Sequence, residues 1–165
     1  MTRTGILAAA RGMMMAAVAV MAIPALAQHD ATAGIHPAHI YPPIEAAKHD
    51  IDKALAEARR THKRVILDFG GDWCGDCQVL NIYFHQSPNA ELLEKHFILV
   101  DVNIGRIDAN GDIAKRYGVP MKGVPALAVI DGHGKVIYAQ ANNQFSDMRH
   151  MDAASVTEFL NTWKH

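Results

Sequence analysis

The sequence predicts a three-layer α/β/α domain built around a central mixed β-sheet. Apolar runs at residues 64–70 and 97–102 suit strands that are buried on both faces, and amphipathic segments around them suit crossover helices. Near the carboxyl end, two short apolar runs flank the glycine-containing loop 131–135, which is typical of an antiparallel hairpin. Parallel strands followed by a hairpin and a closing helix produce a mixed sheet with helices on both sides.

Composition limits the class of protein. The chain has 165 residues, of which 50% are hydrophobic, and this length provides one domain with a sizeable core. Sixteen basic residues nearly balance 17 acidic ones, for a net charge of -1. Because this balance offers no basic field for a phosphate backbone, we expect no nucleic acid partner.

The amino terminus has the features of a secretory signal peptide. Arg3 and Arg11 precede an uncharged apolar stretch at residues 12–26, and Ala25-Leu26-Ala27 supplies the small-x-small pattern that a signal peptidase cuts after. We therefore expect residues 1–27 to be a cleaved signal peptide and the mature protein to be exported to the periplasm. The alternative is a membrane anchor that remains uncleaved.

Residues 28–43 show no sustained period and carry three prolines, which predicts an extended lead-in segment or tether before a domain at 44–165. The segment also contains His29, His36 and His39. These histidines are interpreted as solvated side chains, with metal binding as the alternative.

The expected elements follow in order. Apolar residues at spacings of three, four and seven predict a first amphipathic helix, at Ile44, Ile51, Ala54, Leu55 and Ala58. A buried strand at 64–70 follows, and then a helix that begins near Cys74. Ser87-Pro88 offers an N-cap and a proline at the first helical position, which opens a short helix.

The second half of the chain completes the sheet. A second buried strand is expected at 97–102, then a polar loop at 105–111 and a short helix at 113–117. Strands at 126–130 and 136–139 should pair antiparallel. A final helix follows Asp152 or Ser155 as its cap, with an apolar stripe formed by Val156, Phe159, Leu160 and Trp163.

The two cysteines are the main clue to chemistry. Cys74 and Cys77 lie three positions apart at a helix start, so they share one face, with α-carbons about 5 to 6 Å apart, which a disulfide tolerates. Free backbone N–H groups and the helix dipole favour an anion at Cys74, which predicts a lowered pKa and a nucleophile. Cys77, deeper along the helix, is expected to attack the resulting mixed disulfide.

These residues resemble the thioredoxin superfamily. The resemblance rests on Trp73-Cys74-Gly75-Asp76-Cys77 after a strand that contains Asp68, and on Gly123-Val124-Pro125, and it covers residues 45–163. It implies the thioredoxin fold, attack by the first cysteine and resolution by the second. It also implies that Asp68 is a buried proton acceptor for Cys77, with an edge residue facing water as the alternative.

The resemblance further assigns substrate contacts. Pro125 matches the family's cis-proline, which faces the dithiol, and Val124 matches the residue whose backbone pairs with the substrate chain. Pro120 also follows a valine, but Pro125 begins an apolar strand and is the better cis candidate. For Trp73, substrate contact and a rim or core aromatic are equally supported.

The motif departs from thioredoxin between the cysteines. Gly75 and Asp76 occupy the two positions that tune the redox pair, and Asp76 stands where thioredoxins proper have proline. A carboxylate there should oppose thiolate formation at Cys74, which makes the pair a weaker oxidant and favours a reductant or isomerase. Gly70-Gly71 and a loop at 103–110 also differ, which indicates partner-binding loops of the chain's own.

We therefore expect an exported thiol-disulfide oxidoreductase that requires no prosthetic group. Its partners would be protein disulfides and a membrane thiol-disulfide carrier as electron donor. The alternative is a copper(I)-handling protein for metalloenzyme assembly, with Cys74, Cys77 and either His85 or His133 as ligands. A non-enzymatic interaction module would not need both cysteines. A zinc site is not expected, because no second pair of Cys or His ligands follows at ligand spacing. A covalent haem site is not expected either, because Gln78 stands where that site needs histidine.

Overall fold

The computed structural model describes residues 38–165, so the expected signal peptide at 1–27 and most of the expected lead-in segment lie outside the described residues. The strands are β1 Arg64–Gly70, β2 Phe97–Asn103, β3 Ala126–Ile130 and β4 Val136–Ala139. The helices are α1 Ala47–Thr61, α2 Gly75–Phe84, α3 Asn89–His96, α4 Gly111–Arg116 and α5 Ala153–Trp163, with 3-10 turns η1 Ile44–Ala46 and η2 Met148–His150. Between residues 38 and 165 no helix is both long and apolar enough to cross a membrane.

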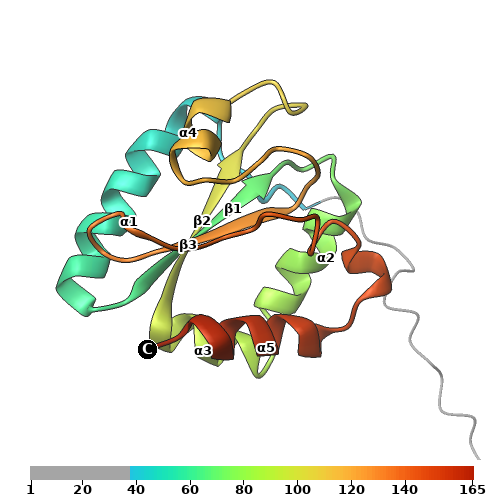
Figure 1. The fold of residues 1–165 in the computed structure, drawn as a ribbon. Helices are drawn as coiled ribbons and strands as arrows, with labels where there is room; N and C mark the ends of the chain where they lie inside the picture. The colour runs from blue at the N-terminus through green and yellow to red at the C-terminus, as the bar shows by residue number, and fades with distance from the viewer. Residues whose placement is uncertain (1–37) are drawn as a thin grey trace, which may run out of the picture. The chain divides into compact units, whose positions relative to one another are not determined.

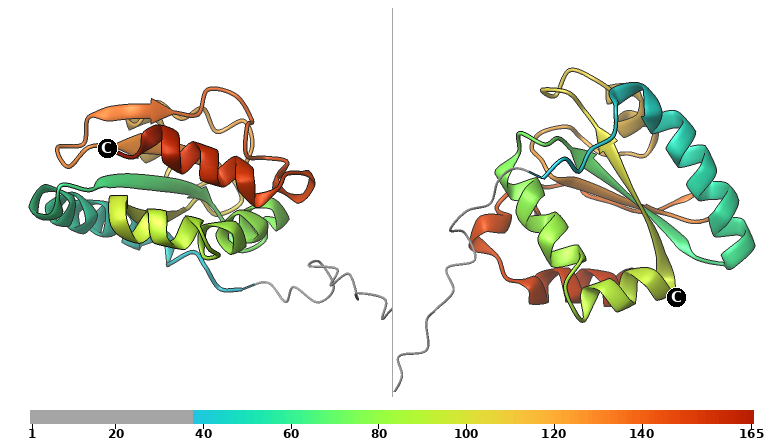
Figure 2. Two further views of the ribbon diagram at one scale, coloured as in Figure 1. Left: turned by 90° about the horizontal axis from the view of Figure 1, so that it is seen from below. Right: turned by 180° about the vertical axis from the view of Figure 1, so that it is seen from behind.

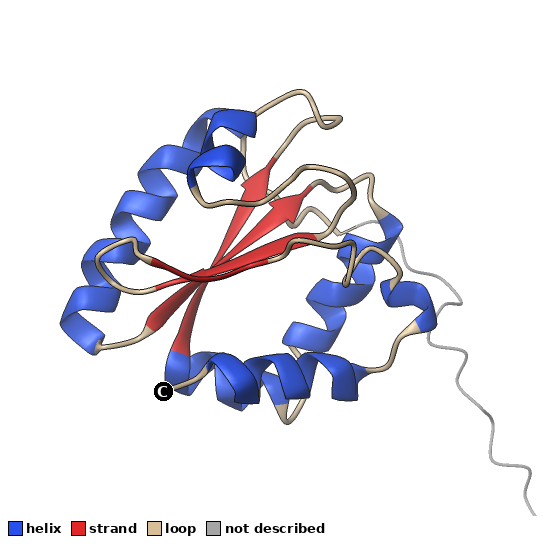
Figure 3. Ribbon diagram, viewed as in Figure 1, coloured by secondary structure: helices blue, strands red, loops and turns tan. Residues whose placement is uncertain are grey.

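The strands form one mixed sheet in the order β2-β1-β3-β4 (Figure 3). β1 pairs parallel with β2, and β3 pairs antiparallel with β4, as the sequence predicts. The sheet is joined by an antiparallel pairing of β1 with β3, which the sequence did not specify. β1 is one of the two inner strands and is buried along nearly its whole length, which explains its continuous apolar run. Asp68 is the exception to that run, and it stands opposite Asp101 of β2 in the register.

Helices cover both faces of the sheet and complete the three layers (Figure 1). On one face, α1 and α4 pack against alternate residues of β1, including Val65, Leu67 and Phe69. On the other face, α2, α3 and α5 pack against Ile66 and the neighbouring strands. This alternation directs Asp68 and Gly70 of β1 toward the face that carries α2.

Some element boundaries differ from the prediction. Ile44 begins a 3-10 turn, and the amphipathic helix starts at Ala47. The Ile44 side chain is exposed, so the buried stripe of the helix begins at Ala47 instead. Ser87 does not cap α3: the Ser87–Pro88 peptide bond is cis, Pro88 occupies the cap position, and no side chain caps that helix. Asp152 does cap α5, because its carboxylate accepts the N–H of Ser155 at 3.1 Å.

Residues 38–43 are not a tether. The Tyr41 side chain in this segment is fully buried, and the segment runs from η1 across to the start of α2 (Figure 2, right). Asp72, just beyond β1, accepts the N–H groups of Ile40 at 2.8 Å and Tyr41 at 3.0 Å. Residues 40 and 41 therefore pack against the domain that begins at Ile44.

Candidate active site

The two cysteines form a disulfide at the start of α2, with α-carbons 5.2 Å apart, close to the separation expected from the sequence. Cys74 is the N-cap of the helix: its backbone is extended, and its sulfur lies 3.1 Å from the backbone nitrogen of Cys77, which donates to it. The Cys74 side chain therefore receives a helix-terminal N–H group, which favours a thiolate there after reduction. Cys74 retains 5% exposure and Cys77 none, so an incoming disulfide can reach Cys74 alone.

Gly70 allows the close packing behind Cys77. A β-carbon at Gly70 would lie 2.8 Å from Cys77 Sγ and would also overlap the Tyr41 hydroxyl. Tyr41, Cys74 and Cys77 consequently form a small cluster of their own, packed against Ile40 and Val124. The Gly70-Gly71 departure noted in the sequence thus accommodates an aromatic ring beneath the disulfide.

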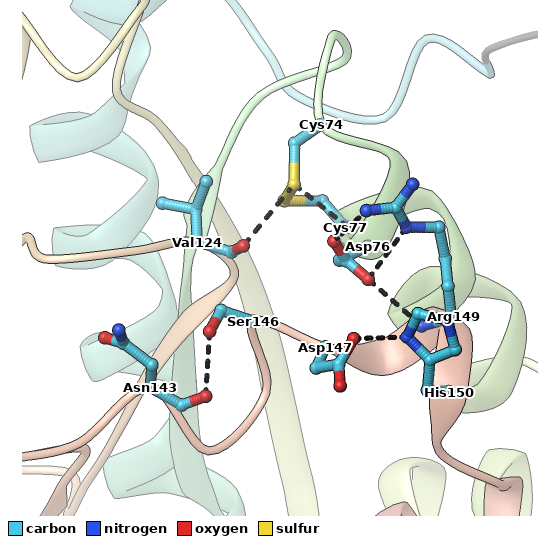
Figure 4. A network of polar contacts seen from close by, with 9 residues as sticks. All are labelled: Cys74, Asp76, Cys77, Val124, Asn143, Ser146, Asp147, Arg149 and His150. Atoms are coloured by element: carbon cyan, nitrogen blue, oxygen red, sulfur yellow. Dashed lines mark hydrogen bonds and ion pairs between the residues drawn. A yellow bond between two sulfur atoms is a disulfide. The ribbon is translucent and has the colours of Figure 1, made fainter.

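Val124 and Pro125 face the disulfide from the loop before β3. The carbonyl oxygen of Val124 lies 3.7 Å from Cys74 Sγ, and the Val124–Pro125 peptide bond is cis (Figure 4). Buried Gln140 holds this turn, because its amide nitrogen donates to the Pro125 carbonyl at 3.4 Å and its oxygen accepts the Leu127 N–H at 3.3 Å. Sequence reasoning did not identify Gln140, which follows β4 with no motif around it.

Asp68 is fully buried on the α2 side of β1, which excludes the alternative of an edge residue facing water. Its Oδ2 accepts the Tyr41 hydroxyl at 2.9 Å, whereas its Oδ1 is buried with no hydrogen-bond partner among residues 38–165. Burial raises the pKa of the Asp68 carboxyl well above its ordinary value and the charge of Asp101 raises it further, while the Tyr41 hydrogen bond lowers it. Sequence reasoning anticipated the burial but neither neighbour.

Asp101 and Tyr41 complete this acidic cluster. Burial raises the pKa of Asp101 to about 6, and the charge of Asp72 adds to that effect while His85 opposes it. Burial also raises the pKa of the Tyr41 phenol well above 10, with Asp68 and Asp101 contributing in the same direction. Asp101 could have been noticed in the sequence, because it is a charged residue inside the apolar run of β2. Tyr41 could not, because the stretch around it shows no periodic pattern.

Asp76 is not an uncompensated charge next to Cys74, which corrects the sequence-based expectation. Arg149 of η2 binds it through two guanidinium contacts of 3.1 Å, and the Arg149 backbone N–H donates to it at 3.0 Å (Figure 4). The Arg149 side chain also lies over Gly75, 3.7 Å from where a β-carbon would be. Because the pair carries no net charge, Asp76 gives no physical reason to prefer a reductant.

Trp73 lies at the rim of the site with 42% of its surface exposed. Its ring N–H donates to the Gly105 carbonyl at 2.5 Å, and the Arg106 guanidinium lies 5.3 Å from the ring centre. The loop predicted at 103–110 therefore supports Trp73 from one side. The exposed face of the ring remains free for a substrate chain, and its role in binding stays a prediction.

No group of three or more His, Cys, Asp or Glu side chains with metal-binding geometry occurs within the described range 38–165. His133 lies in the turn between β3 and β4, and His85 follows α2 and binds the Asn81 carbonyl at 2.8 Å. Neither is brought to the cysteines as a third ligand. This donor set gives the copper(I) alternative no support.

Comparison with known proteins places the chain in a family. A family model described as Thioredoxin-like matches residues 46–132, which is more than half of the chain. The chain belongs to the thioredoxin-like family. A crystal structure titled as a disulphide isomerase from Xylella fastidiosa has the same fold, with a TM-score of 0.72 and 32% identity, and covers 76% of this chain and 96% of that one.

Curated relatives agree with this assignment. The thiol:disulfide interchange protein DsbD 1 of Pseudomonas aeruginosa is 30% identical over 114 residues, which are 67% of this chain but only 18% of that protein. Thioredoxin of Streptomyces clavuligerus is 30% identical over 86 residues, or 52% of this chain and 72% of the relative. This thioredoxin-like chain thus spans about a fifth of the length of the DsbD proteins that it matches.

Proposed function

We propose that this protein is an exported thiol-disulfide oxidoreductase that reduces or exchanges protein disulfides through a mixed disulfide at Cys74. The observation that carries the proposal is the asymmetry of the pair. Cys74 keeps 5% exposure, sits at a helix N-terminus and lies next to the Val124 carbonyl, whereas Cys77 is fully buried. This arrangement separates an attacking sulfur from a resolving one.

The reaction follows from that geometry. In the reduced protein, the Cys74 thiolate attacks one sulfur of a substrate disulfide, and the other substrate sulfur leaves with the electron pair and takes up a proton. Cys77 then loses its proton and attacks Cys74, which closes the Cys74–Cys77 disulfide and releases the second substrate thiol. The protein is oxidised by two electrons and the substrate is reduced by two.

Exchange or reduction, rather than oxidation, is supported by the relatives and not by Asp76. Two of the similar proteins carry the names disulphide isomerase and thiol:disulfide interchange protein. A reductant outside the cytoplasm needs a supply of electrons, and a membrane thiol-disulfide carrier is the partner of suitable chemistry. Export rests on the Arg3, Arg11 and Ala25-Leu26-Ala27 pattern.

The decisive test compares the two serine variants in cells that export the full chain. Cys77→Ser should accumulate as mixed disulfides with substrate proteins, visible on non-reducing gels and lost on reduction. Cys74→Ser is the matched control and should accumulate none, because the remaining thiol is buried. Trapping by Cys74→Ser instead, or faster alkylation of Cys77 than of Cys74 in the reduced protein, would refute the assignment.

Export has its own test. Amino-terminal sequencing of the protein recovered from the periplasmic fraction should begin at Gln28, directly after the predicted cleavage site. Recovery of the intact chain from the membrane fraction would favour the uncleaved anchor instead. Recovery from the cytoplasm alone would refute export.

A further inference from the structure

We propose that Tyr41 is a positioning residue of the dithiol site: its phenol holds the Asp68 carboxylate in the form that accepts the Cys77 proton during resolution. The proposal rests on the function proposed above and deepens it. It assigns a role to the segment before α1, for which the sequence predicts only a tether or an extended lead-in. It also defines Asp101 as the residue that acts against Tyr41.

Tyr41 is the only hydrogen-bond partner of the Asp68 side chain among residues 38–165. Its hydroxyl donates to Oδ2 at 2.9 Å, and Oδ1 has no partner there. Both residues are buried, so the hydrogen bond is shielded from solvent. It stabilises the ionised form of Asp68. Removing the hydroxyl would leave both carboxylate oxygens without a donor from the described chain.

The Tyr41 hydroxyl also lies beside the resolving cysteine. A β-carbon on Gly70 would meet both this hydroxyl and Cys77 Sγ, so the two groups lie against the same glycine. Asp68 is two residues before Gly70 on β1, and residues two apart face the same side of a strand. Phenol, carboxylate and Cys77 sulfur therefore converge on one point behind the disulfide.

The negative charge of Asp101 raises the pKa of Asp68 and therefore opposes the effect of the Tyr41 hydrogen bond. The titratable groups that surround Asp68, directly or through its partners, are Tyr41, Cys77, Asp72, Asp101 and His85. Asp101 stands opposite Asp68 on β2 and disfavours a second negative charge, whereas β3 offers apolar Leu127 at the opposite position. Tyr41 itself remains a donor at every pH of interest, because its phenol pKa is raised well above 10.

The segment that carries Tyr41 is fixed on both sides of the ring. Gln78 accepts the Ala38 N–H at 3.0 Å and donates to the Ala38 carbonyl at 3.0 Å. Asn103, at the end of β2, donates to the Pro42 carbonyl at 2.9 Å. Asp72 after β1 adds two further hydrogen bonds to the backbone of this segment. Because α2, β1 and β2 all hold the segment, the surrounding fold determines the position of the Tyr41 ring.

In the proposed step, the Asp68 carboxylate takes the thiol proton of Cys77. The thiolate attacks Cys74 Sγ of the mixed disulfide, the Cys74–Cys77 bond forms, and the bond between Cys74 and the substrate breaks. The electron pair leaves on the substrate sulfur, which takes a proton from solvent, and Asp68 later returns its proton to solvent. Tyr41 exchanges no proton in this sequence, which is why it is a positioning residue.

The test is the pH dependence of resolution in two variants that should shift it in opposite directions. Reduced protein is converted to the mixed disulfide with glutathione disulfide, and release of the second glutathione is followed by acid quench at pH values from about 5 to about 9. Tyr41→Phe should raise the pH midpoint of the resolution rate by about one unit, because Asp68 loses the hydrogen bond that lowers its pKa. Asp101→Asn should lower it.

Controls separate this role from a general structural one. Tyr138→Phe removes a hydroxyl that binds Gln144 at 3.0 Å away from the disulfide, and it should leave the midpoint unchanged. Tyr41→Phe in an Asp68→Asn background should also have no effect on the midpoint. If Tyr41→Phe does not fold, replacement of tyrosine by 3-fluorotyrosine keeps the ring and strengthens the donor, so the midpoint must then fall.

A direct titration distinguishes failure of this inference from failure of the proposed function. Carbon NMR of the oxidised protein reports ionisation of Asp68 without turnover, and Tyr41→Phe should shift it upward as in the kinetic profile. An unchanged Asp68 titration and an unchanged midpoint in a folded, active Tyr41→Phe protein would overturn the role of Tyr41. A wild-type protein that reacts with no disulfide at any pH would refute the proposed function instead.

Discussion

Asp101 should make the folded protein less stable as the pH rises from weakly acidic to neutral. Its pKa lies at about 6 in the folded protein against an ordinary 3.8, so the folded state binds a proton that the unfolded state has released. Stability is therefore highest below pH 4 for this group and is lost as the pH rises through the folded-state value near 6. The two-unit difference corresponds to about 3 kcal/mol.

Asp101→Asn removes this titration while keeping the side-chain shape. The variant should match the wild type near pH 4, and at pH 7 it should be more stable by about 3 kcal/mol, or by on the order of 10 °C in Tm. Urea and thermal unfolding of the oxidised proteins, followed by circular dichroism at five pH values, would measure the difference. Asp52→Asn, on the exposed side of α1, controls for the loss of one negative charge.

The result that would refute this reasoning is a stability difference between Asp101→Asn and the wild type that does not change with pH. Such a result would mean that Asp101 is ionised in the folded protein over the whole range. A variant that is less stable than the wild type at pH 7 would be equally contradictory. It would indicate that the carboxylate makes a favourable contact that outweighs the cost of burying its charge.

Three further variants test the remaining contacts. Arg149→Gln should raise the pKa of Cys74 in the reduced protein by up to about one unit, because it leaves the Asp76 charge uncompensated. The absorbance of the Cys74 thiolate at ~240 nm, followed against pH, would measure this shift. An unchanged Cys74 pKa would contradict this. Gly70→Ala should lower the free energy of unfolding by about 1–3 kcal/mol, since the new methyl group meets Cys77 Sγ at 2.8 Å, and urea denaturation should detect a loss clearly above about 0.5 kcal/mol. Trp73→Ala should slow reduction of a protein disulfide more than that of glutathione disulfide, and equal slowing of both would remove Trp73 from substrate binding.

The sheet and the position of the cysteines could be predicted because local patterns determine them. The continuous apolar run of β1 reports burial on both faces, and the spacing of Cys74 and Cys77 places them on one turn of helix. The loop after β3 contains the turn residues that a hairpin needs, and the hairpin is present. Each of these inferences needed only a short stretch of sequence.

The surroundings of the dithiol could not be predicted because they come from distant parts of the chain. Arg149 is 73 positions from Asp76, and no local signal in the sequence connects them. Tyr41 is 27 positions from Asp68 and lies among residues whose prolines and lack of period indicated a tether or an extended lead-in segment. In both cases the sequence pointed to the aspartate but could not show which distant residue donates hydrogen bonds to its carboxylate.

The contact between Asp76 and Arg149 also constrains how this motif can change during evolution. Substituting either residue alone leaves a charge without its partner, and for the mostly buried Asp76 that is unfavourable, so relatives should keep both residues or replace both. The same reasoning applies to engineering. Grafting Cys-Gly-Asp-Cys alone onto another thioredoxin-fold scaffold would transfer the acid without its counter-charge, and the grafted pair should not reproduce the redox potential that it has here.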